Sequence, residues 1–267
     1  MNSLELQMVD MLKELKENYS AVSVRAEFES EGTKLEELLR LKEVSMTAGL
    51  GLTLKIGGCE SMRDILEARI VGVNCLAAPM VESAYALSKY LRAVDKVFPP
   101  EEKKNIEIVC DIETSNASDN LEEMLLVPEI AGLQGIVIER VDLCFSLGLK
   151  EDDINSSKVN DIVSNIVEQA KKKNLLCIIG GGVSADSLEF FRSLPQGCLD
   201  RYETRKVCFG CPKALGPRAQ EGILKALAFE VLWLKNKFSY YEGVHSADKK
   251  RLNLLEERYR KAIDELI

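Results

Sequence analysis

The chain has 267 residues, 46% hydrophobic and 29% charged, enough to bury the core of one large domain or two small ones. Lys and Arg total 35 against 43 Asp and Glu, a net charge of -8, and so acidic a chain lacks the clustered cationic surface that grips nucleic acid phosphates. The apolar runs are only strand-length and the first residues do not resemble a secretory signal, so we expect a cytoplasmic protein that binds neither nucleic acid nor membrane.

Short apolar runs alternate with longer amphipathic stretches along the chain. Seven strands are predicted over residues 22–29, 52–56, 75–80, 106–113, 136–142, 176–180 and 201–209. Helical patterns lie between them over residues 34–48, 61–70, 83–94, 121–127, 159–173 and 185–193. Strict alternation of strand and helix predicts a parallel sheet with helices outside it.

This order predicts an α/β fold of the (β/α)8 TIM barrel type. A closed barrel needs eight strands. Either the eighth strand is hidden, for instance in the helical-looking N-terminal region, or the barrel is modified. A doubly wound sheet is the alternative, but its G-x-G-x-x-G turn after the first strand is absent.

We expect one barrel domain over residues 1–267, made of an N-terminal helix (1–19), a barrel core (20–210) and C-terminal helices (220–267). Two such helices are predicted, over residues 222–237 and 247–267. The second carries an apolar stripe of Leu252, Leu255, Tyr259, Ala262, Ile263 and Leu266. A stripe usually packs on its own domain, but this one extends beyond what closing a barrel requires. The sequence therefore predicts a homo-oligomer formed through the C-terminal helices.

Cysteine and histidine usage limits the chemistry. Most of the eight cysteines lie in apolar strand-like runs, as buried reduced cysteines do. Cys208 and Cys211 form the one C-x-x-C pair. A zinc site would require a second such pair or histidines at ligand spacing. His245 is the single histidine, which excludes a multi-His metal site.

Charged residues recur on one face of the predicted strands, mostly near their C-terminal ends. Because the apolar face must meet the helices, the charged face is expected to point into the barrel. The acids are Glu27, Glu29, Asp111, Glu113, Asp142 and Glu203, and the bases are Arg25, Lys55, Arg140 and Arg205. In the fifth strand, Arg140 and Asp142 are taken to share the inward face with Ile136 and Ile138.

Six acids against four bases leave two negative charges, which one divalent cation would balance. Carboxylate ligands without His or Cys favour Mg2+ or Mn2+. The alternative is an internal ion-pair network that only fills the barrel. Glu203 with Arg205, or Arg25 with Glu27, would belong to such a network.

Several segments together resemble the HpcH/HpaI aldolase and citrate lyase family. They are K-I-G-G-C-E at 55–60, Gly72, A-P-M-V-E-S at 78–83, D-I-E-T at 111–114, R-V-D-L at 140–143 and S-L-G at 146–148. The resemblance runs from about residue 26 to residue 149. It implies a barrel of the phosphoenolpyruvate/pyruvate superfamily. The implied chemistry is cleavage or formation of a carbon–carbon bond next to a 2-oxo acid or thioester, with a divalent metal stabilising the enolate.

By this resemblance Glu113 and Asp142 fill the metal-ligand positions, and Asp111 stands where related aldolases often carry glutamine. Lys55 appears in place of the arginine that contacts the enolate oxygen, and it supplies charge without the planar two-pronged contact. The family's early Glu-His pair reads Glu29-Ser30 here. Proton transfer would then fall to Glu29, Glu31, Lys55 or metal-bound water.

The run Ile179-Gly-Gly-Gly182, followed by Ser184, ends the sixth strand. Two readings stay open for it. Backbone N–H groups of Gly181 and Gly182 with Ser184 would bind an anion, or the segment is a tight turn that needs small residues.

The leading prediction is a metal-dependent carbon–carbon lyase acting on a 2-oxo acid or related small molecule. Its catalytic residues would be Lys55, Glu29, Asp111 and Arg140, with Arg140 binding the substrate carboxylate. One alternative is a non-catalytic or regulatory barrel that binds an oxo acid or a phosphorylated metabolite. Another is a phosphate-site enzyme of a different barrel superfamily.

Overall fold

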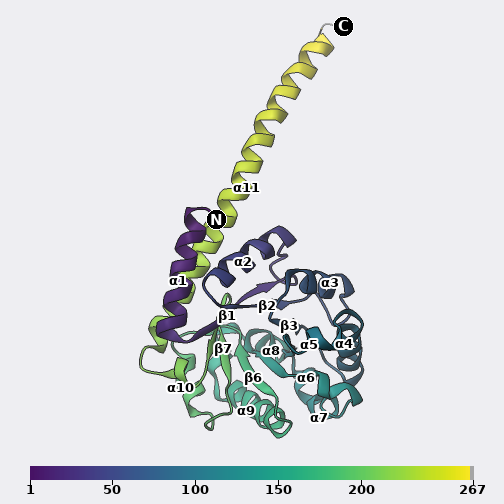
Figure 1. The fold of residues 1–267 in the computed structure, drawn as a ribbon, viewed down its shortest axis with the longest axis vertical. Helices are drawn as coiled ribbons and strands as arrows, with labels where there is room; N and C mark the ends of the chain where they lie inside the picture. The colour runs from purple at the N-terminus through teal and green to yellow at the C-terminus, as the bar shows by residue number, and fades with distance from the viewer. Residues whose placement is uncertain (265–267) are drawn as a thin grey trace.

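The computed structural model describes the backbone of residues 1–264 and the side chains up to residue 260. It is a closed barrel of eight strands with helices around it (Figure 1). The strands are β1 (Ala21–Glu27), β2 (Gly51–Lys55), β3 (Cys75–Ala78), β4 (Glu107–Ile112), β5 (Gly135–Glu139), β6 (Leu176–Gly180), β7 (Arg201–Glu203) and β8 (Val207–Gly210). Each strand pairs with the next and β8 pairs with β1, which confirms the barrel fold.

The barrel is modified at its last strand. The sequence predicted one strand over residues 201–209, whereas the chain forms a hairpin there, with β8 antiparallel to both β7 and β1. The turn is closed by Thr204, whose backbone N–H donates to Val207 O at 2.9 Å. The eighth strand is therefore not in the N-terminal region, which is helix α1 (Ser3–Tyr19).

Helices fill the connections of the parallel part of the barrel. They are α2 (Leu35–Thr47), α3 (Met62–Val71), α4 (Ala84–Val97), α5 (Pro100–Lys103), α6 (Ser115–Asp119), α7 (Leu121–Met124), α8 (Arg140–Ser146), α9 (Ser157–Lys172) and α10 (Ser187–Ser193). Short 3-10 turns are η1 (Pro128–Gly132), η2 (Glu151–Asn155) and η3 (Lys213–Leu215). In α4, for example, Ser83 accepts a hydrogen bond from Ala86 N and so begins the helix.

The barrel interior is layered. Its middle is filled by a separate apolar cluster of Cys75, Ala77, Val109, Val137 and Ile178. The other face of each strand joins the large core under the helices. At one end of the interior Arg201 binds both oxygens of Glu107, at 2.5 and 2.7 Å. Charged side chains fill the end where the parallel strands terminate.

The prediction for the fifth strand is wrong in its side-chain parity. Ile136 and Ile138 lie in the outer core, while Val137 lies in the inner cluster. The strand ends at Glu139, and Arg140 begins helix α8. Because both faces of β5 are apolar up to its last residue, Glu139, the alternation that reveals an inward face is missing.

The C-terminal region is one helix, α11 (Ala219–Asp264), and not the two helices predicted. Gly243, within the stretch between the two predicted helices, weakens a helix but does not end it. The first half of α11 packs beside α1, and the second half projects away from the barrel (Figure 1). The side chains of Ala262, Ile263 and Leu266 lie outside the described residues. Among the helices described, none is long and apolar enough to cross a membrane.

Candidate active site

A cavity of about 680 Å³ opens at the carboxyl ends of the barrel strands. Its lining includes Lys55, Glu29, Asp142, Gly181, Gly182 and Ser184 among the residues predicted for the site. The β7–β8 turn and the start of α11 complete the wall, through Arg205, Leu224 and Leu227. This is the end at which barrel enzymes build their sites.

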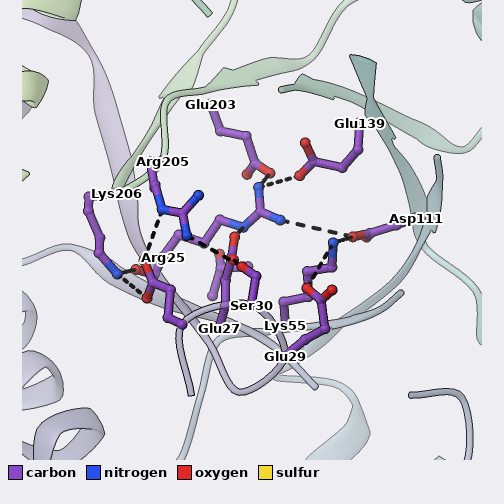
Figure 2. Close-up of polar contacts among 12 residues, drawn as sticks. Arg25, Glu27, Glu29, Ser30, Lys55, Asp111, Glu139, Glu203, Arg205 and Lys206 are labelled. Atoms are coloured by element: carbon purple, nitrogen blue, oxygen red, sulfur yellow. Dashed lines mark hydrogen bonds and ion pairs between the residues drawn. The ribbon is translucent and has the colours of Figure 1, made fainter. Parts of the chain in front are cut away.

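Arg25, on β1, is the centre of the charged interior. Figure 2 shows its guanidinium reaching between Glu203 and Glu139. Its Nη1 lies 2.6 Å from Glu139 Oε1, and its Nε lies 3.2 Å from Glu27 Oε1. Burial alone would lower the pKa of Arg25, but the surrounding carboxylates hold that pKa well above its ordinary value. Arg25 therefore stays charged and ties β1, β5 and β7 together.

Lys55, at the tip of β2, is the second buried cation (Figure 2). Its Nζ lies 2.9 Å from Glu113 Oε2, 3.1 Å from Asp111 Oδ2 and 3.6 Å from Glu29 Oε2. Burial favours its neutral form, yet Asp111 and Glu113 raise its pKa above the ordinary lysine value. Lys55 is thus a permanent ammonium group on the cavity wall.

Glu113 is held on both oxygens. Its Oε2 accepts from Lys55, and its Oε1 accepts a 2.6 Å hydrogen bond from Met80 N. Met80 has a positive φ of 53°, a strained conformation for a residue other than glycine, which orients this N–H. The A-P-M segment therefore positions Glu113.

Negative charge is in excess around these two cations. Five carboxyl groups are buried there, on Glu27, Asp111, Glu113, Glu139 and Glu203. Burial raises the pKa of Asp111 well above its ordinary value and raises that of Glu203 to about 7. The pKa of Glu113 is raised for the same reason. The site takes up positive charge, or protons, readily.

These carboxylates suit a hard divalent cation. Asp111 is fully buried, its Oδ1 has no polar partner and its Oδ2 has only the ion pairs with Lys55 and Arg25, and the ligands offered are carboxylate oxygens. No cluster of three or more His, Cys, Asp or Glu side chains arranged for a metal occurs among the residues described. A cation would therefore need water or substrate as further ligands, as Mg2+ commonly does.

Asp142 comes to the cavity from helix α8 and not from a strand. It lies in the first turn of the helix and is exposed at the cavity wall. Partial burial of the carboxyl group raises its pKa. The structure thus places Asp142 at the cavity, on α8, and Glu113 behind Lys55, directly after β4.

Arg140 does not point into the cavity, contrary to the sequence prediction. It is fully buried, and its guanidinium donates to Gly180 O, Gly181 O and Asn155 Oδ1 at 3.2, 3.0 and 2.9 Å. Its guanidinium also lies 5.2 Å from the ring centre of Phe191. Burial lowers its pKa to about 10. Arg140 ties α8 to the turn after β6.

Replacing Arg140 with methionine should therefore reduce stability and leave substrate affinity unchanged. Four acceptors, on Gly180, Gly181, Asn155 and Ser187, would lose their donor, so we expect a loss of about 3 kcal/mol in the free energy of unfolding. Urea unfolding measures this loss. An Arg140→Met protein of native stability would contradict the structural role.

The glycine run after β6 forms a tight turn. Gly181 and Gly182 have φ values of 72° and 61°. A Cβ on Gly181 would lie 2.5 Å from Arg140 N. Glycine is therefore required for the turn itself. Anion binding by Gly181, Gly182 and Ser184 stays a prediction.

Glu139 is a site residue that the sequence reasoning missed. It pairs with Arg25 and lines the cavity. A Cβ on Gly180 would lie 3.0 Å from Glu139 Oε2, so the absence of a side chain at residue 180 leaves space for the Glu139 carboxylate. Glu139 shares a strand face with Val137, but only the pairing with neighbouring strands shows that this face points inward. The pair expected between Glu203 and Arg205 is absent among the described ion pairs, where Arg205 instead binds Glu31 at 3.3 Å.

Fold and site together define a TIM-barrel protein with an acidic, lysine-containing pocket at the carboxyl ends of its strands. The family model for HpcH/HpaI aldolase/citrate lyase matches residues 58–192, about half of the chain. The chain therefore belongs to the HpcH/HpaI aldolase/citrate lyase family. No curated protein matches it.

Solved structures give the same fold. An HpcH/HpaI aldolase from Desulfitobacterium hafniense DCB-2 is similar with a TM-score of 0.60 and 15% identity, covering 73% of this chain and 81% of that one. The citrate synthase SbnG is similar with a TM-score of 0.59 and 16% identity, over 87% of this chain and 90% of its own. A family protein from Burkholderia cenocepacia J2315 has a TM-score of 0.58 and 13% identity, over 73% and 90%.

Family membership supports an enzyme of the aldolase or citrate lyase type that acts on a small molecule. Members generally depend on a divalent metal ion.

Proposed function

We propose that this protein forms or cleaves a carbon–carbon bond next to the carbonyl group of a 2-oxo acid or related small carboxylate, through an enolate. The observation that carries the proposal is the Lys55 ammonium group on the cavity wall, held from behind by Asp111 and Glu113, in a chain of this family. A permanent cation beside developing enolate charge stabilises the transition state electrostatically.

We assign the metal to Glu113 and Asp142, as the family resemblance implies. Mg2+ or Mn2+ suits carboxylate ligands and the surplus of buried acid. A bound divalent cation would polarise the substrate carbonyl and stabilise the enolate oxygen. Asp111 has the different role of orienting Lys55, whose Nζ lies 3.1 Å from its Oδ2.

Proton transfer is assigned to Glu29. Its side chain is 39% exposed and lines the cavity 3.6 Å from Lys55, so it reaches both solvent and substrate. Histidine is not among the residues that line the cavity in the described part of the chain. Arg140 is turned away from the cavity, so the far carboxylate of the substrate is assigned to the wall formed by Gly181, Gly182 and Ser184. The exposed Arg205 lines the same cavity.

Hydrogen exchange of pyruvate tests the proposal without knowledge of the acceptor. In deuterated buffer with Mg2+, the native protein should replace the methyl protons of pyruvate, as followed by proton NMR. Replacing Glu113 with Gln removes the negative charge of a proposed metal ligand and keeps the size and shape of the side chain. The rate of pyruvate hydrogen exchange should therefore fall by about 100-fold or more. Calorimetric titration with Mg2+ and oxalate, an enolate mimic, should show binding to the native protein and none to Glu113→Gln.

Glu107→Gln is the matched control. Glu107 is an inward carboxylate on the same strand, but it is bound by Arg201 at the opposite end of the barrel. The Glu107→Gln protein should bind oxalate and exchange the methyl protons of pyruvate as the native protein does. Unchanged exchange in Glu113→Gln would remove Glu113 from the mechanism. Metal-dependent oxalate binding without any exchange would favour the non-catalytic alternative.

We also propose a cytoplasmic location. All eight cysteines are free, which suits a reducing compartment.

A further inference from the structure

The outer half of α11 has no packing partner in the described part of the chain. Every side chain from residue 242 to residue 260 is exposed. Figure 1 shows this part of the helix standing clear of the barrel. Helices in proteins owe most of their stability to packing of an apolar face, so a long helix with such a face needs a partner.

An apolar stripe runs along this helix and begins where α11 lines the cavity. Its positions alternate in steps of three and four residues, which is the heptad pattern of a coiled coil. We define the α11 stripe as Leu224, Leu227, Val231, Leu234, Phe238, Tyr241, His245, Asp248, Leu252, Leu255 and Tyr259. Its aliphatic side chains and Phe238 and Tyr259 are 43–68% exposed. Ala226, Phe229 and Trp233 occupy a different side of the helix and are buried.

The stripe has a polar centre. His245 and Asp248 interrupt it, with apolar positions on both sides. We propose that a second copy of this chain covers the α11 stripe from Leu234 to Tyr259, with the two helices antiparallel and centred on these two residues. His245 of each copy then lies opposite the partner's Asp248, where an imidazole N–H can donate a hydrogen bond to the carboxylate.

The same alignment pairs the apolar positions with one another. Leu255 comes opposite the partner's Phe238, and Tyr259 comes opposite the partner's Leu234. Tyr241, whose hydroxyl donates to Glu37 Oε1 at 2.5 Å, comes opposite the partner's Leu252. A parallel pair would instead set each Asp248 against the other Asp248. The antiparallel arrangement therefore leaves no charge without a partner in the seam.

Charges beside the stripe favour the same arrangement. On one flank Lys235 meets the partner's Glu256, and Glu242 meets the partner's Lys249. Because the pair is symmetric, each contact occurs twice. On the other flank Lys237 approaches the partner's Arg258, but Lys237 Nζ is already neutralised by Glu37 Oε2 at 3.1 Å. This self-complementarity identifies a second copy as the occupant of the stripe.

The first test compares two adjacent leucines in the full chain. Leu254 and Leu255 are each 50% exposed, but only Leu255 belongs to the stripe. By sedimentation velocity the native protein should be a dimer, or a larger assembly built on one. Leu255→Asp should lose this association, whereas Leu254→Asp should keep it. A native chain that sediments as a monomer, or equal effects of the two variants, would overturn the proposal.

The second test identifies the orientation. Lys235→Glu and Glu256→Lys each place like charges together in an antiparallel homodimer, so each alone should associate several-fold more weakly. Mixing the two variants restores both attractive contacts between unlike copies, and the mixture should regain native association. A parallel pair would not regain it, because residue 235 would then face Glu230. Failure of the mixture to associate therefore overturns the antiparallel arrangement.

This inference is independent of the proposed chemistry. All four variants lie outside the cavity lining, so their pyruvate exchange as monomers reports on the active site separately from their mass.

Discussion

Replacing Lys55 with methionine is expected to reduce pyruvate exchange by about 1,000-fold, because the charge aimed at the developing enolate is lost at an unchanged volume. Asp111 and Glu113 would then be buried without their cation, and the free energy of unfolding should fall by about 3–5 kcal/mol at neutral pH. The deficit should shrink in acid, where both carboxyl groups protonate. Exchange by NMR and urea unfolding at two pH values measure the two effects.

Two control variants separate these effects. Lys206 is also buried, at 2% exposure, but it binds Glu31 at the edge of the site. Lys206→Met should lose stability and keep most of its exchange activity. Lys55→Arg restores charge with the residue that the family resemblance implies at this position, and should recover part of the activity. Native exchange in Lys55→Met would exclude Lys55 from the chemistry.

Replacing Arg25 with methionine is expected to produce the largest loss of stability in the molecule. Arg25 contacts Glu27, Glu139 and Glu203, and all three would remain buried without it. We expect a loss of about 5 kcal/mol at pH 8, measured by guanidinium unfolding. Such a loss is comparable to the total stability of many domains.

The loss should depend on pH in a defined direction. Burial raises the pKa of Glu203 to about 7, above its unfolded value of 4.5, so the native fold loses stability as pH rises between these values. At pH 5 Glu203 is protonated and has less need of Arg25, so the Arg25→Met deficit should be smaller there. It should not vanish, because Arg25 helps keep the pKa of Glu27 low against the effect of its burial. A deficit that grows toward acid would contradict this network.

The parallel part of the fold follows from the sequence because its strands are short apolar runs bounded by amphipathic helices. The predicted and observed bounds of β6 coincide, and β2 and β4 differ by one residue at each end. The hairpin of β7 and β8 was not predicted, because its turn holds Thr204, Arg205 and Lys206 and no glycine, proline or asparagine.

Side-chain direction was predictable only where polar and apolar residues alternate. In β4, Glu107, Val109 and Asp111 point inward as expected from the charges that mark one face. In β5 the inner and outer faces are both apolar, so neither Glu139 nor the outward turn of Arg140 had a local signal. Which face of β5 points inward is set by its pairing with the neighbouring strands, and such long-range pairing is not encoded in the pattern of one segment.

Helix α11 connects two regions of the molecule without an intervening joint. Leu224 and Leu227 form part of the pocket wall, and Tyr259 lies far along the same rod, at 1.5 Å per residue about 50 Å away. No loop interrupts α11 between these positions, so we expect a tilt of the distal half to be transmitted toward these two leucines. The wall of the cavity and the outer end of α11 therefore belong to one continuous helix.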